Sequence, residues 1–367
     1  MKSRMSLLPV ETKNHNMLPF KGYTVTHLLI SSNCSLPSRT NLKMLCHFNG
    51  TVLISVLPPL LVTEFVLGVI GNGLALWIFC FHLRPWKSST VLLFNLAVAD
   101  FLLNTALPFR ASYYNSELKW MFGGHFCNIC LFMLALNRSG STFFLMAIAV
   151  DRYMRVVHPH HPINSLSVTK AMFGALAIWL IAISMTAHIF TLQHDNKSYC
   201  ESFMIETVAN RNLTWHRFAF LFSFYVPLFV ILYCTVHIVS QMRGRQLAQH
   251  AKIKKALCFI IIVVVVFIIC FLPSNITQLL IWIKTRKLNK TLPESQVCPA
   301  LENLTTAFYI TISLTYINSM LDPVVYYFSS PAFKNFCRKA LHLPQTETVE
   351  SKERKTRETG SQSLSQL

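Results

Sequence analysis

The sequence predicts an all-α membrane protein, a bundle of seven transmembrane helices with a short membrane-surface helix after the seventh span. Of its 367 residues, 53% are hydrophobic and only 13% are charged, against roughly 25% charged residues in soluble domains. Seven apolar segments each exceed the ~20 residues that a helix needs to cross a bilayer. The basic residues lie mostly in the short segments between them, as in other membrane proteins.

The net charge of +18 raises the question of nucleic-acid binding. No nucleic-acid motif occurs in the chain, and the positions of its basic residues are better explained by membrane topology. The sequence also contains no Gly-rich phosphate loop, no metal-spaced His/Cys cluster and no nucleophile elbow. We therefore predict neither an enzyme nor a nucleic-acid partner, and no cofactor apart from an allosteric sodium ion.

The seven apolar segments are expected to be helices, because lipid offers no hydrogen-bond partner to a free backbone group. They are placed at residues 53–82, 88–114, 126–156, 168–192, 215–242, 251–283 and 305–329. This gives four regions: an extracellular glycosylated tail (1–52), the seven-helix bundle (53–329), an amphipathic surface helix (330–342) and a disordered cytoplasmic tail (343–367).

Glycosylation sequons and basic residues predict the same orientation in the membrane. With the N-terminus outside, six sequons face the extracellular side, and they lie at Asn33, Asn49, Asn196, Asn212, Asn289 and Asn303. The same orientation places the basic stretches 82–87, 152–161, 243–255 and 334–339 inside. We therefore expect a multi-pass protein of the plasma membrane with an extracellular N-terminus.

Four basic residues lie between the sixth and seventh apolar segments. The predicted orientation places these residues on the outside, where they form a solvated loop or steer anions inward; they are Lys284, Arg286, Lys287 and Lys290.

After the seventh span, residues 332–341 form a basic amphipathic pattern, which predicts a helix on the inner membrane face with Phe333 and Phe336 toward lipid.

The third apolar segment contains two arginines, Arg138 near its middle and Arg152 at its end. They are 14 residues apart, nearly four helical turns, so both project from roughly the same side of one helix. An arginine inside a membrane span is costly and by default marks a functional site. We interpret Arg138 as the anchor for an anionic ligand. The alternative is an arginine that backbone carbonyls or an internal acid already satisfy.

Polar and proline residues within the spans form an ordered set. It runs from Gly71-Asn72 in the first span through Asp100, Asp151-Arg152-Tyr153, Trp179, Pro227 and Pro273 to Asp322-Pro323 and Tyr326 in the seventh. This set resembles that of the rhodopsin-like, class A G-protein-coupled receptors. Longer stretches, at residues 72–82, 132–138, 156–161 and 318–331, resemble the hydroxycarboxylic acid receptors, with the oxoeicosanoid receptor second. The resemblance covers all seven spans.

The resemblance implies that Arg138 binds a carboxylate and that Tyr316 also reaches it. Further ligand-binding positions implied in the same way are Arg110, Ser202, Phe203, Phe308, Tyr309 and Ile312. Ordinary core packing remains the alternative for the last three, and an interfacial arginine remains the alternative for Arg110. Gln278 stands where the lactate receptor has an arginine, which leaves room for a larger or less polar acid.

The resemblance also implies a switch at the inner side and two disulfides. The switch comprises Asp151, Arg152, Tyr153, Phe271, Pro273, Asp322, Pro323 and Tyr326. The disulfides pair Cys127 with Cys200 and Cys46 with Cys298. Asp100 would hold an allosteric sodium ion together with Ser141, Asn318 and Ser319, and the alternative is a water-filled hydrogen-bond cluster without an ion.

These observations favour a receptor for a small hydroxy- or monocarboxylic acid that signals through an inhibitory heterotrimeric G protein to lower cyclic AMP, with arrestin and membrane lipid as further partners. A receptor for an oxidised fatty acid is the alternative within the same class. An anion transporter with Arg138 in its path is the alternative from a different class, and it would favour internal repeats, which the sequence does not show.

Overall fold

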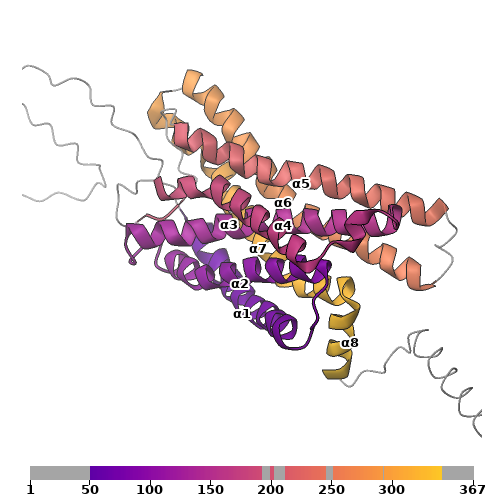
Figure 1. Cartoon of the computed structure of the whole chain (residues 1–367). Helices are drawn as coiled ribbons and strands as arrows, with labels where there is room; N and C mark the ends of the chain where they lie inside the picture. The colour runs from indigo at the N-terminus through magenta and orange to yellow at the C-terminus, as the bar shows by residue number, and fades with distance from the viewer. Residues whose placement is uncertain (1–49, 192–198, 202–210, 245–250, 292, 341–367) are drawn as a thin grey trace, which may run out of the picture. The chain divides into compact units, whose positions relative to one another are not determined.

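In the computed structural model, the described part of the chain is built from long α-helices and their connections (Figure 1). The structure describes residues 50–191, 199–201, 211–244, 251–291 and 293–340. The helices are α1 (Thr51–Phe81), α2 (Ser88–Asn115), α3 (Gly124–Val157), α4 (Val168–Thr186), α5 (Arg211–Gly244), α6 (Ala251–Thr291), α7 (Glu294–Ser329) and α8 (Pro331–Ala340). Two 3-10 turns, Pro162–Ser165 and Ala187–Thr191, flank α4. The predicted fold class, seven long helices and a short eighth, is confirmed.

Six of the described helices, α1 to α6, are long and apolar enough to cross a membrane by length and composition alone. Helix α7 is also long, at 36 residues, but it carries more polar side chains. Several of them, including Asn318, Ser319 and Asp322, are buried inside the protein. Because these groups face protein and not lipid, a polar composition is compatible with a seventh span.

Helix α3 lies at the centre of the bundle. It contacts α2, α4, α5 and α7, while α1 packs against α2 and α7, and α6 packs against α5 and α7. Every residue of α3 from Leu136 to Leu145 is buried. A helix that is buried on all sides has no lipid-facing stripe. A polar side chain in this part of α3, such as Arg138, therefore projects into protein and not into the membrane.

The connection between α6 and α7 differs from the expectation of a solvated basic loop. Helix α6 continues to Thr291 and α7 begins at Glu294, so only two residues separate the two helices. Val297 and Leu301, which lie in the expected loop, are buried in the core. Apolar packing thus stabilises helical structure beyond the hydrophobic segment. Within the extension, the Lys284 Nζ donates to the carbonyl oxygen of Ala300 (2.9 Å).

The surface helix α8 has the predicted position, but the prediction for one of its phenylalanines is wrong. Phe333 is 4% exposed and packs against Phe79 and Tyr326, with ring centroids 5.5 and 6.2 Å away. It therefore anchors α8 to the bundle and does not face lipid. Phe336 lies further out, beside Trp77 and His82. The amphipathic pattern identified one face of α8 correctly, but part of that face meets protein.

Close packing of α1 against α7 supplies a stability prediction. A Cβ atom on Gly71 would lie 2.7 Å from Cγ of Pro323, whose ring cannot rotate away, whereas a Cβ on Gly73 would meet nothing closer than 3.8 Å. We expect Gly71→Ala to lower the free energy of unfolding by about 1–3 kcal/mol. Gly73→Ala is the matched control on the same helix. Thermal unfolding of the purified protein measures both, and equal stability of the two variants would contradict the packing.

Candidate functional site

Arg138 is buried at the interface of α3 and α5. The residue is only 4% exposed. The Nη1 group donates to the carbonyl oxygen of Phe220 and to the Oγ of Ser223, both at 3.0 Å. The guanidinium carbon lies 3.5 Å from the centroid of the Phe220 ring. These acceptors are neutral, so the positive charge is stabilised by dipoles and a π face, without an anion.

The other edge of the Arg138 guanidinium has no partner in the described structure. Neither Nε nor Nη2 has a hydrogen-bond acceptor among the described residues. By the naming convention for arginine, these two nitrogens share one edge, and their N–H bonds run parallel. That edge is suited to a carboxylate, which accepts two parallel charge-assisted hydrogen bonds.

A cavity of about 650 Å³, including its open mouth, has Arg138 among its lining residues. Its walls come from α2, α3, α4, α5, α7 and the loop after α4. Seven of the sixteen lining side chains are apolar, and the other nine carry a polar or charged group. The lining residues are Arg110, Leu131, Leu134, Ala135, Arg138, Ser139, Met185, Thr186, His188, Glu201, His216, Ala219, Phe220, Tyr309, Ile312 and Tyr316. A cavity that combines apolar walls with polar groups able to orient a ligand is typical of small-molecule sites.

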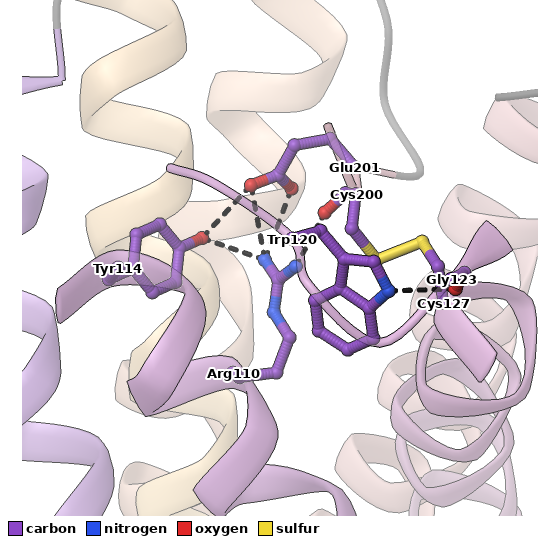
Figure 2. Close-up of a disulfide and its surroundings, with 7 residues drawn as sticks. All are labelled: Arg110, Tyr114, Trp120, Gly123, Cys127, Cys200 and Glu201. Atoms are coloured by element: carbon purple, nitrogen blue, oxygen red, sulfur yellow. Dashed lines mark hydrogen bonds and ion pairs between the residues drawn. A yellow bond between two sulfur atoms is a disulfide. The ribbon is translucent and has the colours of Figure 1, made fainter. Parts of the chain in front are cut away.

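A second arginine, Arg110 of α2, lines the same cavity but is fully engaged (Figure 2). Its Nη1 donates to the carbonyl oxygen of Cys200 at 2.7 Å, and its Nη2 donates to the Tyr114 hydroxyl at 2.7 Å. The same Nη2 lies 3.2 and 3.1 Å from the two carboxylate oxygens of Glu201. Both members of this ion pair are buried, with 7% and 3% of their side chains exposed.

Glu201 lies in the loop after α4, outside the membrane-spanning segments. Burial raises the pKa of its carboxyl group, and the adjacent Arg110 guanidinium opposes that rise. Its neighbour Cys200 forms a disulfide with Cys127 at the start of α3. The disulfide and the ion pair together hold this piece of loop against α2 and α3, as Figure 2 shows.

The structure distributes the other predicted ligand-binding residues unevenly. Tyr309, Ile312 and Tyr316 line the cavity from α7. Phe308 is fully buried behind it, with its ring 5.9 Å from that of Phe220. Gln278 is buried in α6 but does not line the cavity. Ser202 and Phe203 lie outside the described residues.

Several polar residues of the cavity were not anticipated from the sequence. Glu201 was not among the predicted site residues, and neither was Ser223, which accepts a hydrogen bond from Arg138 but does not line the cavity. His188 and His216 form a contact of 2.6 Å between ring nitrogens at the α4–α5 side of the cavity. The signal available for Glu201 was its position next to Cys200, because the implied disulfide to α3 places that residue over the pocket.

At the opposite end of the bundle, the predicted switch residue Arg152 lines a second cavity with residues of α3, α5, α6 and α7. Asp151 is 3.9 Å from the Nε of Arg152 but makes a closer, bidentate contact with Arg155 at 2.9–3.0 Å. Tyr153 contacts His158 through its hydroxyl (3.2 Å). Arg155 was not identified from the sequence, although its spacing of four residues from Asp151 is typical of helical ion pairs.

The buried Asp100 of α2 is the centre of a polar cluster. Its Oδ1 accepts hydrogen bonds from Asn137 (3.1 Å) and Ser141 (3.0 Å), and its Oδ2 accepts one from Tyr326 (3.0 Å). The Oγ of Ser319 is 3.4 Å from the Asn137 amide. The predicted ligand Asn318 instead donates to Asp322 at 3.2 Å.

The cluster has the chemistry of a hard-cation site, because Asp100, Ser141 and Ser319 converge with oxygen atoms. Each carboxylate oxygen of Asp100 also accepts a hydrogen bond from the protein. The donor set therefore fits a sodium ion through three of the four predicted residues. It equally fits the hydrogen-bonded cluster without an ion.

Phe271 connects the upper cavity to the kink-prone part of α6. Its ring packs on Phe267 and Phe224, with centroids 4.9 and 6.3 Å apart. The Arg138 guanidinium carbon is 5.9 Å from its centroid. Pro273 interrupts the helical hydrogen bonds two residues further along α6. A change at Arg138 can therefore reach α6 through direct ring contacts.

Of the two predicted disulfides, the one between Cys127 and Cys200 is present in the structure. Cys46 and the side chain of Cys298 lie outside the described residues, so the second pairing is untested. The same holds for the sequons at Asn33, Asn49 and Asn196 and for the side chains of Asn212 and Asn289. Asn303 is exposed on α7.

Comparison with known proteins places this arrangement in a family. Residues 71–326 match the family described as 7 transmembrane receptor (rhodopsin family). The chain is 48% identical to human hydroxycarboxylic acid receptor 2 over 299 residues, which cover 80% of each chain. It is 45% identical to human hydroxycarboxylic acid receptor 1 over 80% of this chain and 82% of that one. Its identity to human oxoeicosanoid receptor 1 is 40%, over 81% and 76% of the two chains.

These matches confirm the predicted resemblance, and with it a receptor and not an enzyme. The matched region extends from α1 to the end of α7 and contains both cavities and the Asp100 cluster. Receptors of this family are multi-pass membrane proteins that bind a ligand and act on a heterotrimeric G protein. The chain belongs to the rhodopsin family of G-protein-coupled receptors, class A, and is related to the hydroxycarboxylic acid receptors.

Proposed function

We propose that this protein is a plasma-membrane receptor for a small monocarboxylic or hydroxycarboxylic acid. The observation that carries the proposal is that Arg138 lines the cavity and that its Nε and Nη2 have no acceptor among the described residues. The names of the 45–48% identical relatives, hydroxycarboxylic acid receptors, support the same ligand class. In the low dielectric of the bundle, a guanidinium–carboxylate pair is much stronger than in water.

The proposed mechanism is a shift between two receptor conformations. The ligand carboxylate accepts hydrogen bonds from Nε and Nη2 of Arg138, and Tyr316 contacts the ligand from α7. The neutralised guanidinium then interacts differently with Phe220 and Phe271, and this biases the packing of α6 around Pro273. The inner cavity beside Arg152 opens to an inhibitory G protein, which lowers cyclic AMP, and later to arrestin.

An oxidised fatty acid is the second candidate ligand, and one observation favours it. Leu131, Leu134, Ala135, Met185 and Ala219 give much of the cavity an apolar wall, which suits an acyl chain. A relative at 40% identity is named oxoeicosanoid receptor 1. The carboxylate of such a ligand would use the same Arg138 edge.

A panel of acids tests the proposal. Lactate, 3-hydroxybutyrate, nicotinate and oxidised arachidonate are applied to cells that express the full chain, and inhibition of cyclic AMP formation is measured. At least one acid is expected to lower cyclic AMP in these cells and not in cells without the receptor. An Arg152→Ala receptor at equal surface density is the signalling-deficient control. Silence of the surface-expressed receptor toward all four acids would count against the ligand class.

A further inference from the structure

We propose that Glu201 sets the charge that the receptor selects in its ligand, because this acid neutralises one of the two guanidinium groups in the cavity and leaves the other for a single carboxylate. The inference rests on the proposed function and makes it more specific. It assigns to Glu201 a role in specificity that is separate from ligand anchoring by Arg138.

The first step is the charge balance of the cavity. Among the described residues that line it, the arginine and carboxylic-acid side chains are Arg110, Arg138 and Glu201, and we take Glu201 as ionised because it is paired with Arg110. Arg110 and Glu201 form a buried ion pair at 3.1 Å. With His188 and His216 neutral, the cavity therefore carries one net positive charge, located at Arg138. One ligand carboxylate cancels this charge.

The second step is the difference in how the two arginines are satisfied. Both terminal nitrogens of Arg110 already have acceptors, in Cys200, Tyr114 and Glu201. Arg138 contacts neutral acceptors on Nη1, and its other edge has no acceptor in the part of the chain that the structure describes. A second ligand carboxylate would have to displace Glu201 from Arg110, or remain buried without a counter-charge. An uncompensated buried charge is strongly unfavourable.

The third step is the rigidity of the ion pair. Glu201 follows a disulfide-bonded cysteine, and its Oε1 also accepts a hydrogen bond from the Tyr114 hydroxyl at 3.3 Å. The backbone carbonyl of Cys200 is itself bound by Arg110. The loop therefore holds the carboxylate in place, so a ligand gains little by pushing it aside.

The inference predicts that removal of the Glu201 charge releases Arg110 for a second carboxylate. The probes are matched acid pairs in which one methyl group becomes a carboxylate: butyrate and succinate, 3-hydroxybutyrate and malate, octanoate and octanedioate. Concentration–response curves for G-protein activation give the dicarboxylate-to-monocarboxylate potency ratio of each pair. In Glu201→Gln we expect this ratio to rise by at least about tenfold, or about 1.4 kcal/mol, for the pair whose length fits.

A matched control separates charge from loop structure. The double variant Arg110→Gln/Glu201→Gln removes both members of the ion pair and restores the charge balance, so its ratio is expected to stay near that of the wild type. Glu201→Ser also removes the charge of Glu201. It takes the place of Glu201→Gln in the test when the glutamine variant is poorly expressed. Surface labelling normalises every curve.

The outcomes distinguish this inference from the proposed function. An unchanged ratio in surface-expressed Glu201→Gln and Glu201→Ser receptors that still respond to monocarboxylates overturns the role of Glu201 alone. An equal rise of the potency ratio in the double variant also overturns the role of Glu201, because the effect would then not depend on Arg110. A wild-type receptor that responds to no acid in the pairs or in the earlier panel overturns the proposed function, and the inference falls with it.

Discussion

Arg138→Ala is expected to raise the acid concentration that gives half-maximal G-protein activation by at least about 30-fold, because loss of one partner of a buried charge pair costs roughly 2–5 kcal/mol. The substitution removes a cavity-lining side chain whose Nε and Nη2 donors have no acceptor among the described residues. It also removes the hydrogen bonds to Phe220 and Ser223, which are weaker contributors because those acceptors are neutral. The readout is the concentration–response curve of the most potent acid from the panel.

Two variants control this experiment. Arg138→Lys keeps the positive charge but loses the parallel pair of donors, so its potency is expected to lie between those of Arg138→Ala and the wild type. Arg286→Ala removes an exposed cation of α6, whose guanidinium lies 4.9 Å from the Trp282 ring, and is expected to leave potency unchanged. A surface-expressed Arg138→Ala receptor with wild-type potency would refute the carboxylate anchor.

Loss of the Cys127–Cys200 disulfide is expected to lower the free energy of unfolding by about 4 kcal/mol, from the entropy of the loop that it closes. The two cysteines are 73 residues apart, and the loop between them includes α4. The cross-link also positions Glu201 against Arg110. Cys200→Ala should therefore reduce both surface expression and thermal stability, measured on intact cells and on purified receptor.

The cysteine experiment has a control on the same helix. Cys130 is a free, buried cysteine three residues after Cys127. Cys130→Ala removes one buried sulfur atom without a cross-link, so its effect is expected to be much smaller. The double variant Cys127→Ala/Cys200→Ala should be no less stable than either single variant, because both remove the same bond. Additive losses would show that the two residues act through separate contacts.

Most of the fold could be predicted from the sequence because the bilayer leaves few choices. A long apolar segment in lipid has to form a helix, and charge and sequons give its direction. The ends of the helices were less predictable. Helix α6 extends to Thr291 and α7 begins at Glu294 because residues such as Leu301 pack into the core above the apolar segments. Hydropathy alone does not contain that tertiary packing.

Single residues of the candidate site could be predicted where their charge is energetically costly inside a membrane span. Contacts between residues that are far apart in the sequence could not be predicted. Arg138 stands out because a charge inside a membrane span requires an explanation. The pairing of Arg110 with Glu201 joins residues 91 positions apart, and no local pattern reports it. Phe333 shows the same limit, because the periodicity of α8 gives its apolar face but not the surface that this face contacts.

The two-residue separation of α6 and α7 has a mechanical consequence. Helices joined this tightly at one end behave as a lever with its fixed point at the join, so displacement grows with distance from it. Lys284 reinforces the join through its bond to Ala300. We therefore expect a small rearrangement at Phe271 to be amplified toward the end of α6 that lies away from the join, while the joined end keeps its width.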